Sequence, residues 1–345
     1  MTVQHPSYRV AAVQAAPVFL NLDATVDKTI ALIEEAAQGG ASLIAFPETW
    51  IPGYPWFAWL GAPIWGMKFL QAYHDNSLII DGAQFERITQ AASRYNITVV
   101  LGFSEKDAGS LYISQAIISP EGKAVTRRKL KPTHVERTMF GEGDGSDLAV
   151  HATPLGRIGA LCCWEHLQPL TKYAMYAQNE QVHVAAWPSF SLYVDAAYAL
   201  GPEVNTAASR LYAAEGQCFV VAPCATVSQE MVNLMCETPE QQTLLKIGGG
   251  HARIYGPDGR SLADPLPPEV EGLLYADIDL GVITLAKAAA DPSGHYSRPD
   301  VTQLLLDRNP KPRVVYVKQE PNNNVNSPDS QVDERTGSEA SDNQA

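Results

Sequence analysis

The sequence has few cysteines, and their placement excludes a domain built on disulfides. Five cysteines are spread over 345 residues, an odd number without regular spacing. Small secreted domains that depend on disulfides carry a denser and more regular set. No Cys and His cluster has the spacing of a metal site either. We therefore expect free thiols, a reducing cytoplasmic location, and neither a metal nor another cofactor.

The sequence also lacks a basic segment and a long apolar run. Lys and Arg number 25 against 38 Asp and Glu, which gives a formal net charge of -13. A nucleic-acid partner held through its phosphates needs a basic surface, so none is expected. No stretch reaches the roughly 18 apolar residues of a membrane span. The N-terminus, MTVQHPSYRV, lacks the basic and then apolar order of a signal peptide, which favours the cytoplasm.

Hydrophobic residues make up 46% of the chain, enough for a large buried core. Their periodicity and the turn residues between them predict alternating strands and helices. The predicted strands are 8–19, 42–46, 97–103, 111–119, 124–130, 155–163, 182–187, 218–227, 252–255 and 273–278, and the predicted helices are 21–38, 85–95, 169–180 and 203–216. Such alternation is typical of an α/β fold with one continuous core.

The composition changes from Pro321 onward. Asn, Ser, Asp and Glu dominate this tail, and it contains no aromatic residue. Such a segment buries too little apolar surface to offset the conformational entropy that it would lose on ordering. We expect the tail to be disordered and to lie outside the core.

Three reactive side chains lie at the ends of predicted strands. Glu48, Lys129 and Cys163 each lie at or just beyond such an end. Functional groups in α/β sheets gather at the carboxyl ends of strands. A thiol with an ordinary pKa of about 8.5 needs a base or a nearby cation to react at neutral pH. A carboxylate can take its proton, and a lysine can stabilise the charge that develops on the attacked atom.

Each of these residues has a neighbour that could take its role. Cys162 precedes Cys163, and the period-2 alternation of a strand puts the two thiols on opposite faces without saying which face is the pocket. Lys131 lies two residues beyond Lys129, where the strand ends. His166 could replace a carboxylate as the base, although its place at a strand-to-helix turn favours a packing role.

Three blocks of sequence resemble the hallmark blocks of the nitrilase superfamily. They are FPETWIPGYPWF (46–57), RRKLKPTHVERTMFGEGDGSDL (127–148) and GALCCWEHLQPL (159–170), and they are most similar to the true nitrilase branch. The resemblance implies a single domain with the family's four-layer αββα sandwich. This domain would span 7–305 and leave 306–345 as a C-terminal extension, disordered from about 321.

The resemblance also implies the catalytic residues. The family's glutamate falls on Glu48, its lysine on Lys129, and its nucleophile, the cysteine directly before Trp-Glu, on Cys163. A further carboxylate of the family's site falls on Glu136. The backbone N–H of Trp164 is expected to join Lys129 in holding the tetrahedral intermediate.

An aromatic loop is expected to form part of the substrate pocket. Four aromatic residues crowd the segment 54–59, just after the predicted base. Aromatic walls suit an apolar aryl or arylacetonitrile substrate. The predicted substrate-binding residues are Tyr54, Trp164 and Trp187, of which Tyr54 and Trp187 match positions that the family uses near its pocket.

The implied function is that of a nitrilase. The cysteine would attack an aryl, arylacetonitrile or aliphatic nitrile and release a carboxylic acid and ammonia through a thioimidate and a thioester. A cyanide dihydratase or an amide-forming nitrile or cyanide hydratase of the same family stays open as an alternative, because pocket size and the fate of one intermediate separate them. An amidase and a non-catalytic member are further alternatives. The KPTHVER segment disfavours the amidase, and the intact catalytic set disfavours the non-catalytic member. The family also implies a homo-oligomer whose dimers build into a spiral filament.

Overall fold

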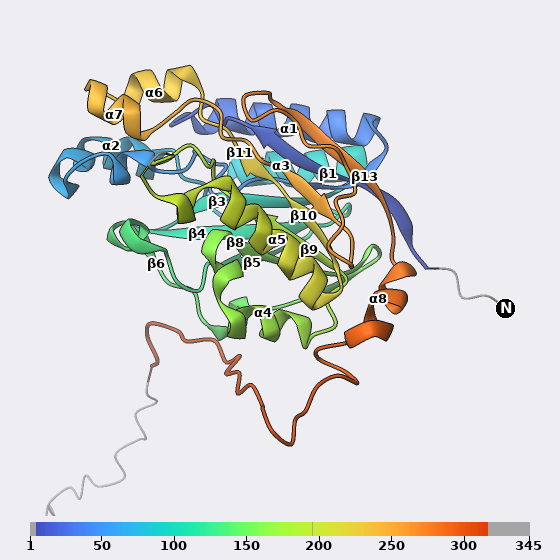
Figure 1. The fold of residues 1–345 in the computed structure, drawn as a ribbon. Coiled ribbons are helices and arrows are strands. Elements are labelled where there is room, and N and C mark those ends of the chain that lie inside the picture. The colour runs from blue at the N-terminus through green and yellow to red at the C-terminus, as the bar shows by residue number, and fades with distance from the viewer. Residues whose placement is uncertain (1–4, 195, 317–345) are drawn as a thin grey trace, which may run out of the picture. The chain divides into compact units, whose positions relative to one another are not determined.

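The computed structural model describes residues 5–194 and 196–316 (Figure 1). The chain divides after Pro310 into two units. Every described helix and strand belongs to the first unit, and 311–316, the described part of the second, contains neither. The tail predicted to be disordered from about 321 lies outside the described residues. No helix in the described ranges is long and apolar enough to cross a membrane.

Two β-sheets form the centre of the first unit. The larger has eight strands in the order β11-β1-β2-β3-β4-β5, with β13 paired to β1 and β6 paired to β4. Its strands are β1 (Ser7–Ala15), β2 (Ala41–Ala45), β3 (Thr98–Asp107), β4 (Ser110–Ile118), β5 (Ala124–Arg128), β6 (Phe140–Gly141), β11 (Cys224–Ala225) and β13 (Gly272–Asp279). The smaller sheet has the order β12-β10-β9-β8-β7. Its strands are β7 (His151–Thr153), β8 (Gly156–Cys162), β9 (Val182–Ala186), β10 (Phe219–Ala222) and β12 (Arg253–Tyr255).

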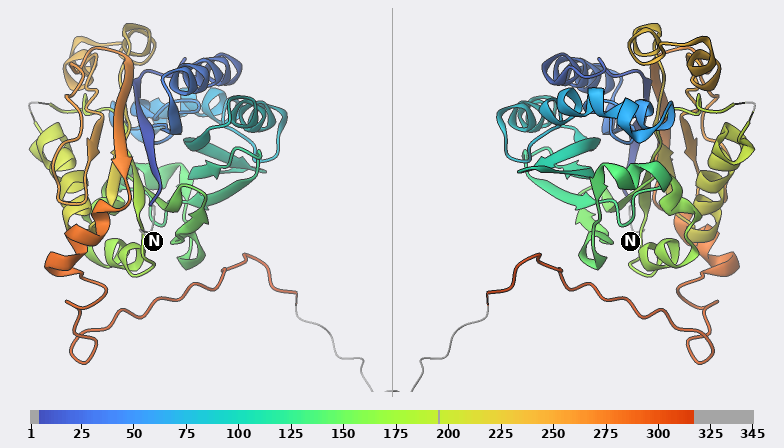
Figure 2. Two further views of the ribbon diagram at one scale, coloured as in Figure 1. Left: turned by 90° about the vertical axis from the view of Figure 1, so that its right-hand side faces the viewer. Right: turned by 90° about the vertical axis from the view of Figure 1, so that its left-hand side faces the viewer.

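Helices cover the outer face of each sheet, as the edge-on views in Figure 2 show. The apolar faces of α1 (Leu22–Gln38) and α3 (Ala83–Tyr95) share one buried cluster with the larger sheet. Residues of α4 (Pro169–Tyr176) and α5 (Pro202–Gly216) pack with the smaller sheet and with residues of β1 and β2 between the sheets. The order is helix, sheet, sheet, helix, so the predicted αββα sandwich is confirmed.

The remaining helices are short or peripheral. They are α2 (Pro63–Asp75), α6 (Gln229–Met235), α7 (Pro239–Leu244), α8 (Val282–Ala290) and the 3-10 helices η1 (Trp56–Trp59), η2 (His134–Thr138), η3 (Gly145–Asp147), η4 (Cys163–Leu167) and η5 (Tyr198–Leu200). None of them was predicted. Two of the 3-10 helices, η2 and η4, hold the candidate catalytic residues Glu136 and Cys163.

For the predicted helix 21–38, the local sequence pattern was sufficient to predict the bounds of the helix. Asn21 caps the helix by accepting a hydrogen bond from the backbone N–H of Ala24 at 3.1 Å, and the apolar residues Val26 and Ile33 are fully buried. Gly39 follows as the C-terminal cap. Because cap, apolar stripe and stop all agree, the observed bounds differ from the predicted ones by a single residue.

Other predicted bounds are wrong, and proline explains the largest error. The predicted strand 218–227 divides at Pro223 into β10 and β11, which belong to different sheets. Proline has no N–H to donate to a strand ladder, so the chain leaves one sheet there and joins the other. The predicted strand 8–19 ends at Ala15, two residues before Pro17, and the predicted helix 169–180 ends at Tyr176.

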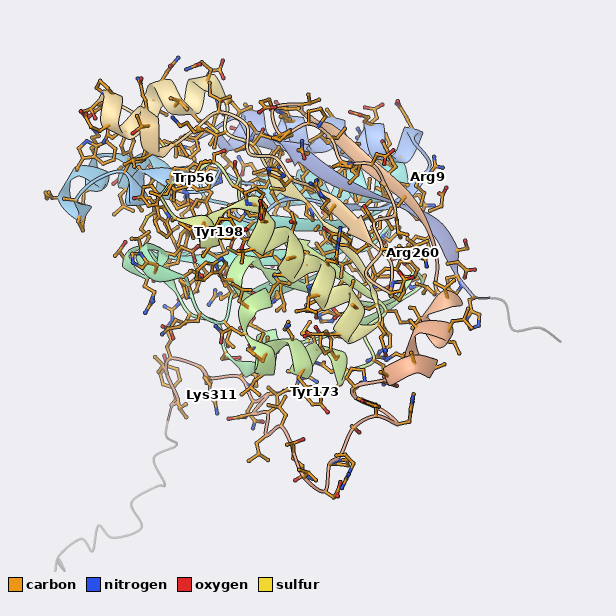
Figure 3. The ribbon with its side chains drawn as sticks, viewed as in Figure 1. Arg9, Trp56, Tyr173, Tyr198, Arg260 and Lys311 are labelled. Atoms are coloured by element: carbon orange, nitrogen blue, oxygen red, sulfur yellow. The ribbon has the colours of Figure 1, made fainter. Side chains whose placement is uncertain are left out.

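The sheet topology brings the predicted strand ends together. β5 is antiparallel to β4, β4 is antiparallel to β3, and β3 is parallel to β2, so β2 and β5 point the same way. Their carboxyl ends lead to Glu48 and Lys129, and the carboxyl end of β8 in the facing sheet leads to Cys163. Figure 3 shows Trp56, at the start of η1, at the opposite end of the sandwich from Arg9 on β1.

Candidate active site

A glycine lets the segment that carries Glu48 lie close against β3. A Cβ atom at Gly102 would overlap the carbonyl oxygen of Pro47 and would lie 3.1 Å from the Cα of Glu48. Only a residue without a side chain permits this approach. Glu48 is thereby held against β3 in the interior, with an exposed fraction of 0%.

Lys129 lies between two buried carboxylates. Its Nζ donates to Glu48 Oε1 and to Glu136 Oε2, each at 2.8 Å. The three side chains are at most 1% exposed. Burial disfavours the charged amine, but the attraction of Glu136 and Glu48 outweighs this effect and raises the pKa of Lys129. Lys131 instead pairs with Glu142 at the surface, where its side chain is 60% exposed.

Glu136 is fixed by its own helix and by the aromatic loop. It lies in η2, and its Oε2 accepts the backbone N–H of Thr133 at 2.6 Å, a capping-box contact. Its Oε1 accepts the hydroxyl of Tyr54 at 2.6 Å. With Lys129 also donating to Oε2, the carboxylate has little freedom to move. The predicted pocket residue Tyr54 therefore positions a predicted catalytic residue.

One carboxylate oxygen of Glu48 has no hydrogen-bond partner in the described residues. This oxygen, Oε2, is buried. Burial raises the pKa of Glu48 to about 7, the charge of Lys129 opposes the rise, and the charge of Glu136 adds to it. A carboxyl group with a pKa near neutrality and an unengaged oxygen suits proton transfer.

Cys163 occupies a strained backbone position at the start of η4. Its φ is 49°, in the left-handed region that residues with a Cβ rarely adopt, and such strain often accompanies function. Burial and the charge of Glu48 raise the pKa of the thiol well above its ordinary value, whereas Lys129 and the backbone N–H of Trp164 lower it. The resting thiol is therefore protonated at neutral pH, and its reaction requires a base.

Cys162 faces a different environment. Its side chain is fully buried in the apolar cluster that contains Trp56 and Tyr73, whereas Cys163 lines a cavity. The two thiols thus have different surroundings, but strand alternation is not the cause, because β8 ends at Cys162 and Cys163 begins η4. Burial raises the pKa of the Cys162 thiol as well. All five cysteines of the chain are free.

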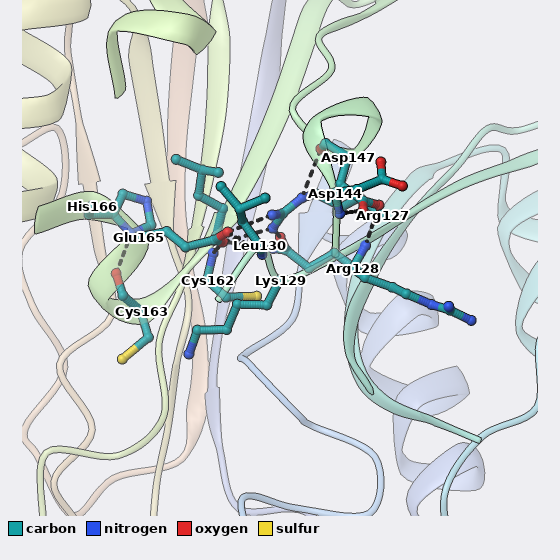
Figure 4. A network of polar contacts seen from close by, with 12 residues as sticks. Arg127, Arg128, Lys129, Leu130, Asp144, Asp147, Cys162, Cys163, Glu165 and His166 are labelled. Atoms are coloured by element: carbon teal, nitrogen blue, oxygen red, sulfur yellow. Dashed lines mark hydrogen bonds and ion pairs between the residues drawn. The ribbon is translucent and has the colours of Figure 1, made fainter. Parts of the chain in front are cut away.

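A buried ion pair ties the two sheets together behind the site (Figure 4). Arg127 on β5 donates to both oxygens of Glu165 in η4, at 2.9 and 2.7 Å. Glu165 also accepts the backbone N–H of Cys162 at 2.8 Å and that of Leu130 at 2.9 Å. These bonds connect the segment that carries Lys129 to the segment that carries the cysteines. The pair therefore sets their separation.

His166 does not face the thiol. Its Nδ1 contacts the carbonyl oxygen of Cys163 at 2.7 Å, and its Nε2 contacts Nε2 of His183 at 2.9 Å. Burial lowers the pKa of His166 to about 3. With both ring nitrogens engaged away from the sulfur, the packing role expected for His166 fits the structure and the role of base does not.

Two of the four candidate catalytic residues, Glu136 and Cys163, line a small cavity of about 40 Å³, and Glu48 and Lys129 are not among its lining residues. The other residues in the cavity walls are a largely apolar set. These are Tyr54, Trp56, Trp59, Thr133, Trp164, Pro188, Ser189, Phe190, Leu192, Leu200 and Asn205. Two of the three predicted substrate-binding residues, Tyr54 and Trp164, are among them.

Trp187, the third predicted substrate-binding residue, lies behind the cavity wall. Its indole N–H donates to Ser209 Oγ at 2.8 Å, and its ring packs against Phe190 with centroids 5.6 Å apart. Phe190 is the residue that lines the cavity. Trp187 was predicted from the sequence, but Phe190, three residues further along the chain, was not.

Asn205 is a cavity residue that the sequence did not suggest. Its Oδ1 accepts the indole N–H of Trp164 at 3.0 Å, and its Nδ2 donates to the carbonyl oxygen of Gly201 at 2.7 Å. Nothing in the neighbouring sequence distinguishes a polar cavity residue on α5 from a polar residue that faces solvent. In the residues that the structure describes, no group of three or more His, Cys, Asp and Glu is arranged to hold a metal ion.

A family model and individual relatives both indicate the same protein family. Residues 9–288 match the model of the carbon-nitrogen hydrolase family. The chain is 67% identical over 308 residues to a nitrilase of Pseudomonas syringae pv. syringae, covering 89% of this chain and 92% of that protein. It is 53% identical over 310 residues to an arylacetone-specific nitrilase of Alcaligenes faecalis, covering 89% and 87% of the two chains.

A solved structure shares the fold. The carbon-nitrogen hydrolase of Helicobacter pylori G27 superposes with a TM-score of 0.67 at 17% identity, over 86% of this chain and 97% of that one. Fold, family model and relatives agree. The chain therefore belongs to the carbon-nitrogen hydrolase family, in its nitrilase branch.

Proposed function

We propose that this chain is a nitrilase that hydrolyses an organic nitrile to a carboxylic acid and ammonia with Cys163 as the nucleophile. The observation that carries the proposal is the buried contact of Lys129 with Glu48 and Glu136 beside a cavity lined by Cys163. The names of the relatives support the nitrile as substrate.

The first half-reaction forms a covalent thioimidate. The free oxygen of Glu48 takes the thiol proton, and the thiolate attacks the nitrile carbon. The proton passes from the carboxyl group to the nitrile nitrogen, so a C–S bond and an N–H bond form as one C–N π bond is lost. Lys129 and the backbone N–H of Trp164 stabilise the negative charge that develops on nitrogen.

The second half-reaction needs two waters. The first adds to the thioimidate carbon and gives a tetrahedral intermediate with S, OH and NH₂ on one carbon. Protonation of the amine by Glu48 or Glu136 breaks the C–N bond, releases ammonia and leaves a thioester. The second water cleaves the C–S bond and releases the acid, and the thiol regains its proton. One nitrile and two waters thus give one acid and one ammonia.

The cavity favours a substrate with an apolar side chain. Aromatic residues from three segments line it, namely Trp56 and Trp59, Trp164, and Phe190. Aromatic walls bury apolar substituents well. We propose arylacetonitriles as the preferred class, with shorter aliphatic nitriles as slower substrates.

The matched test compares Cys163→Ala with Cys162→Ala. We expect Cys163→Ala to abolish ammonia release from phenylacetonitrile and to prevent acylation of the enzyme, which intact-mass spectrometry detects. Cys162→Ala should retain acylation and turnover, because that thiol packs in the core. Turnover that survives in Cys163→Ala and disappears in Cys162→Ala would overturn the assignment of the nucleophile.

A substrate panel separates the family's other activities. Phenylacetonitrile, a short aliphatic nitrile, cyanide and phenylacetamide are compared by ammonia release, and acid and amide products are separated by chromatography. A nitrilase releases acid and ammonia from the nitriles. Activity on cyanide alone, amide as the main product, or activity on the amide alone would contradict the proposal and identify the corresponding alternative.

We also propose that the chain forms a homo-oligomer through α4 and α5, and that these dimers extend into filaments. Leu170 on α4 and Leu211 on α5 are apolar yet 69% and 50% exposed. The two helices contact each other and flank η4. Sedimentation velocity of the wild type and of Leu211→Glu tests the interface. Equal sedimentation coefficients would contradict it.

A further inference from the structure

A chain of buried polar groups lies behind Cys163, outside the cavity. His166 contacts the carbonyl oxygen of Cys163, His183 on β9 contacts His166, and Glu180 contacts His183 Nδ1 at 2.7 Å. Tyr212 on α5 donates to the second oxygen of Glu180 at 2.6 Å. These four residues, at most 1% exposed, are called the histidine chain here. None of them lines the cavity of the candidate site.

Its hydrogen bonds define where the protons lie. The carbonyl oxygen of Cys163 can only accept, so His166 carries a hydrogen on Nδ1. A neutral His166 then has a bare Nε2, and His183 must carry a hydrogen on Nε2 to donate to it. The contact between His183 Nδ1 and Glu180 Oε1 also needs one hydrogen, on either atom. The three contacts are therefore satisfied by three protons.

Loss of one proton breaks a contact. A charged Glu180 attracts the remaining hydrogen of His183 to Nδ1 and leaves its Nε2 bare. Neither His166 Nε2 nor His183 Nε2 would then carry a hydrogen, and the hydrogen bond between the two rings would be lost. His166 could restore this bond by carrying its hydrogen on Nε2 instead, but it would then no longer donate to the carbonyl of Cys163. The protonation of Glu180, three contacts away, is thus coupled to the backbone of the nucleophile.

We propose that the histidine chain holds the strained backbone of Cys163 in the geometry for attack, with His166 as the positioning residue. The proposal rests on the proposed function, in which Cys163 is the nucleophile. A left-handed backbone at a residue with a Cβ persists only where surrounding contacts fix it, and the bond from His166 is such a contact. Sub-ångström control of a nucleophile has large effects on rate.

The surroundings of the histidine chain keep its protons in place. Burial lowers the pKa of both histidines, the charge of Arg127 adds to this effect, and the charge of Glu165 opposes it. Burial raises the pKa of Glu180 to about 8, and its hydrogen bond from Tyr212 opposes the rise. On the far side, Tyr176 packs edge-on against Tyr212, and the protonated thiol of Cys218 lies near the same ring. The chain therefore holds its third proton at neutral pH.

The first experiment compares His166→Asn with His166→Leu. The asparagine amide can replace the Nδ1 hydrogen that the carbonyl of Cys163 accepts, and leucine cannot. We expect His166→Leu to lower kcat for phenylacetonitrile about 100-fold with little change in KM, and to slow alkylation of Cys163 by iodoacetamide. His166→Asn should recover at least about 10-fold in both. His74→Leu, on α2 outside this network, is the matched control and should keep wild-type rates.

The pH dependence of kcat distinguishes the proposed role from a purely structural one, because a residue that only packs would not change it. The wild-type kcat should fall as pH rises through about 8, where Glu180 loses its proton. In Glu180→Gln, the amide donates to His183 permanently and still accepts from Tyr212, so this fall should disappear. Equal rates in the two His166 variants, or an unchanged alkaline fall in Glu180→Gln, would overturn the proposal.

A measurement on the unmodified enzyme decides the case if the variants do not fold. ¹⁵N NMR of histidine-labelled enzyme at neutral pH should show hydrogen on Nδ1 of His166 and on Nε2 of His183. Hydrogen on Nε2 of His166 would overturn the proposal. Neither this measurement nor the alkylation rate requires nitrile turnover, so their outcome is separate from that of the substrate panel.

Discussion

Glu48 is the residue whose charge controls the first chemical step. Its pKa, raised to about 7 chiefly by burial, means that the basic form grows as pH rises through neutrality. We therefore expect kcat/KM to rise through about pH 7 and then to level off before the alkaline fall. In Glu48→Gln the rise should vanish, and kcat should fall about 100- to 10,000-fold, the usual contribution of a general base.

The control for this prediction is a carboxylate of the same size outside the site. Glu142 pairs with Lys131 at the surface and is 52% exposed. Glu142→Gln should keep the wild-type pH profile. A Glu48→Gln enzyme with a wild-type rise through pH 7 would show that another group is the base.

Lys129 is the only described cation in contact with Glu48 and Glu136, so its loss leaves two buried carboxylates uncompensated. Breaking a buried ion pair typically costs about 3–5 kcal/mol. We expect Lys129→Met to lose that much free energy of unfolding and to lose activity. Lys131→Met, two residues away at the surface, should stay within about 0.5 kcal/mol of the wild type. Urea unfolding followed by circular dichroism measures both, and equal losses in the two variants would contradict the expectation.

At the scale of elements, the ion pair of Arg127 and Glu165 fixes how β5 meets η4. Arg127 and Lys129 are two residues apart, and Glu165 lies two residues beyond Cys163, so one contact sets the spacing of the two proposed catalytic groups. Glu165→Gln leaves a buried guanidinium without its carboxylate. We expect a loss of about 3–5 kcal/mol and a fall in kcat that exceeds any change in KM.

A surface ion pair provides the comparison. Arg260 and Asp258 form one whose side chains are 74% and 47% exposed. Asp258→Asn should change the free energy of unfolding by less than about 1 kcal/mol, because exposed pairs contribute little. If Glu165→Gln proved as mild as Asp258→Asn, the buried pair would not be what spaces the site.

Local pattern predicted the elements whose signals agree with one another. The cap, apolar stripe and glycine stop of α1 gave its bounds, and the ends of β2, β5 and β8 pointed to Glu48, Lys129 and Cys163. The helices α6 and α7, with 7 and 6 residues, are too short to show a helical period. The division at Pro223 depends on which sheet each half joins, and contacts with residues distant in sequence determine that.

The supporting contacts of the site could not be predicted for the same reason. Arg127 and Glu165 are 38 residues apart in sequence, and Glu180 and Tyr212 are 32 apart. Each of these side chains alone resembles a solvated charge or a packing aromatic. These side chains become partners only because the two sheets pack face to face and α5 packs on the smaller sheet.

At the scale of the whole molecule, buried acids and histidines make stability depend on pH. The pKa values of Glu48 and Glu180 are raised by burial from 4.5 to about 7 and about 8. A group with a raised pKa in the folded state contributes stability that is complete below 4.5 and is lost as pH rises to the folded value. His166 acts in the opposite sense, since its pKa falls from 6.5 to about 3 and its contribution is lost as pH falls below 6.5.

These opposing effects cancel in part between pH 4.5 and 6.5, and above 6.5 only the two acids of these three groups continue to titrate. We therefore expect the free energy of unfolding to decline from pH 6.5 to 8, each buried acid contributing up to about 1.4 kcal/mol per pH unit while it holds its proton. Glu180→Gln has no proton to lose, so its decline should be shallower by that amount. Urea unfolding at pH 6.5, 7.25 and 8 measures the slopes. Parallel slopes for the wild type and Glu180→Gln would mean that the pair of Glu180 and His183 has already lost this proton to solvent in the folded enzyme.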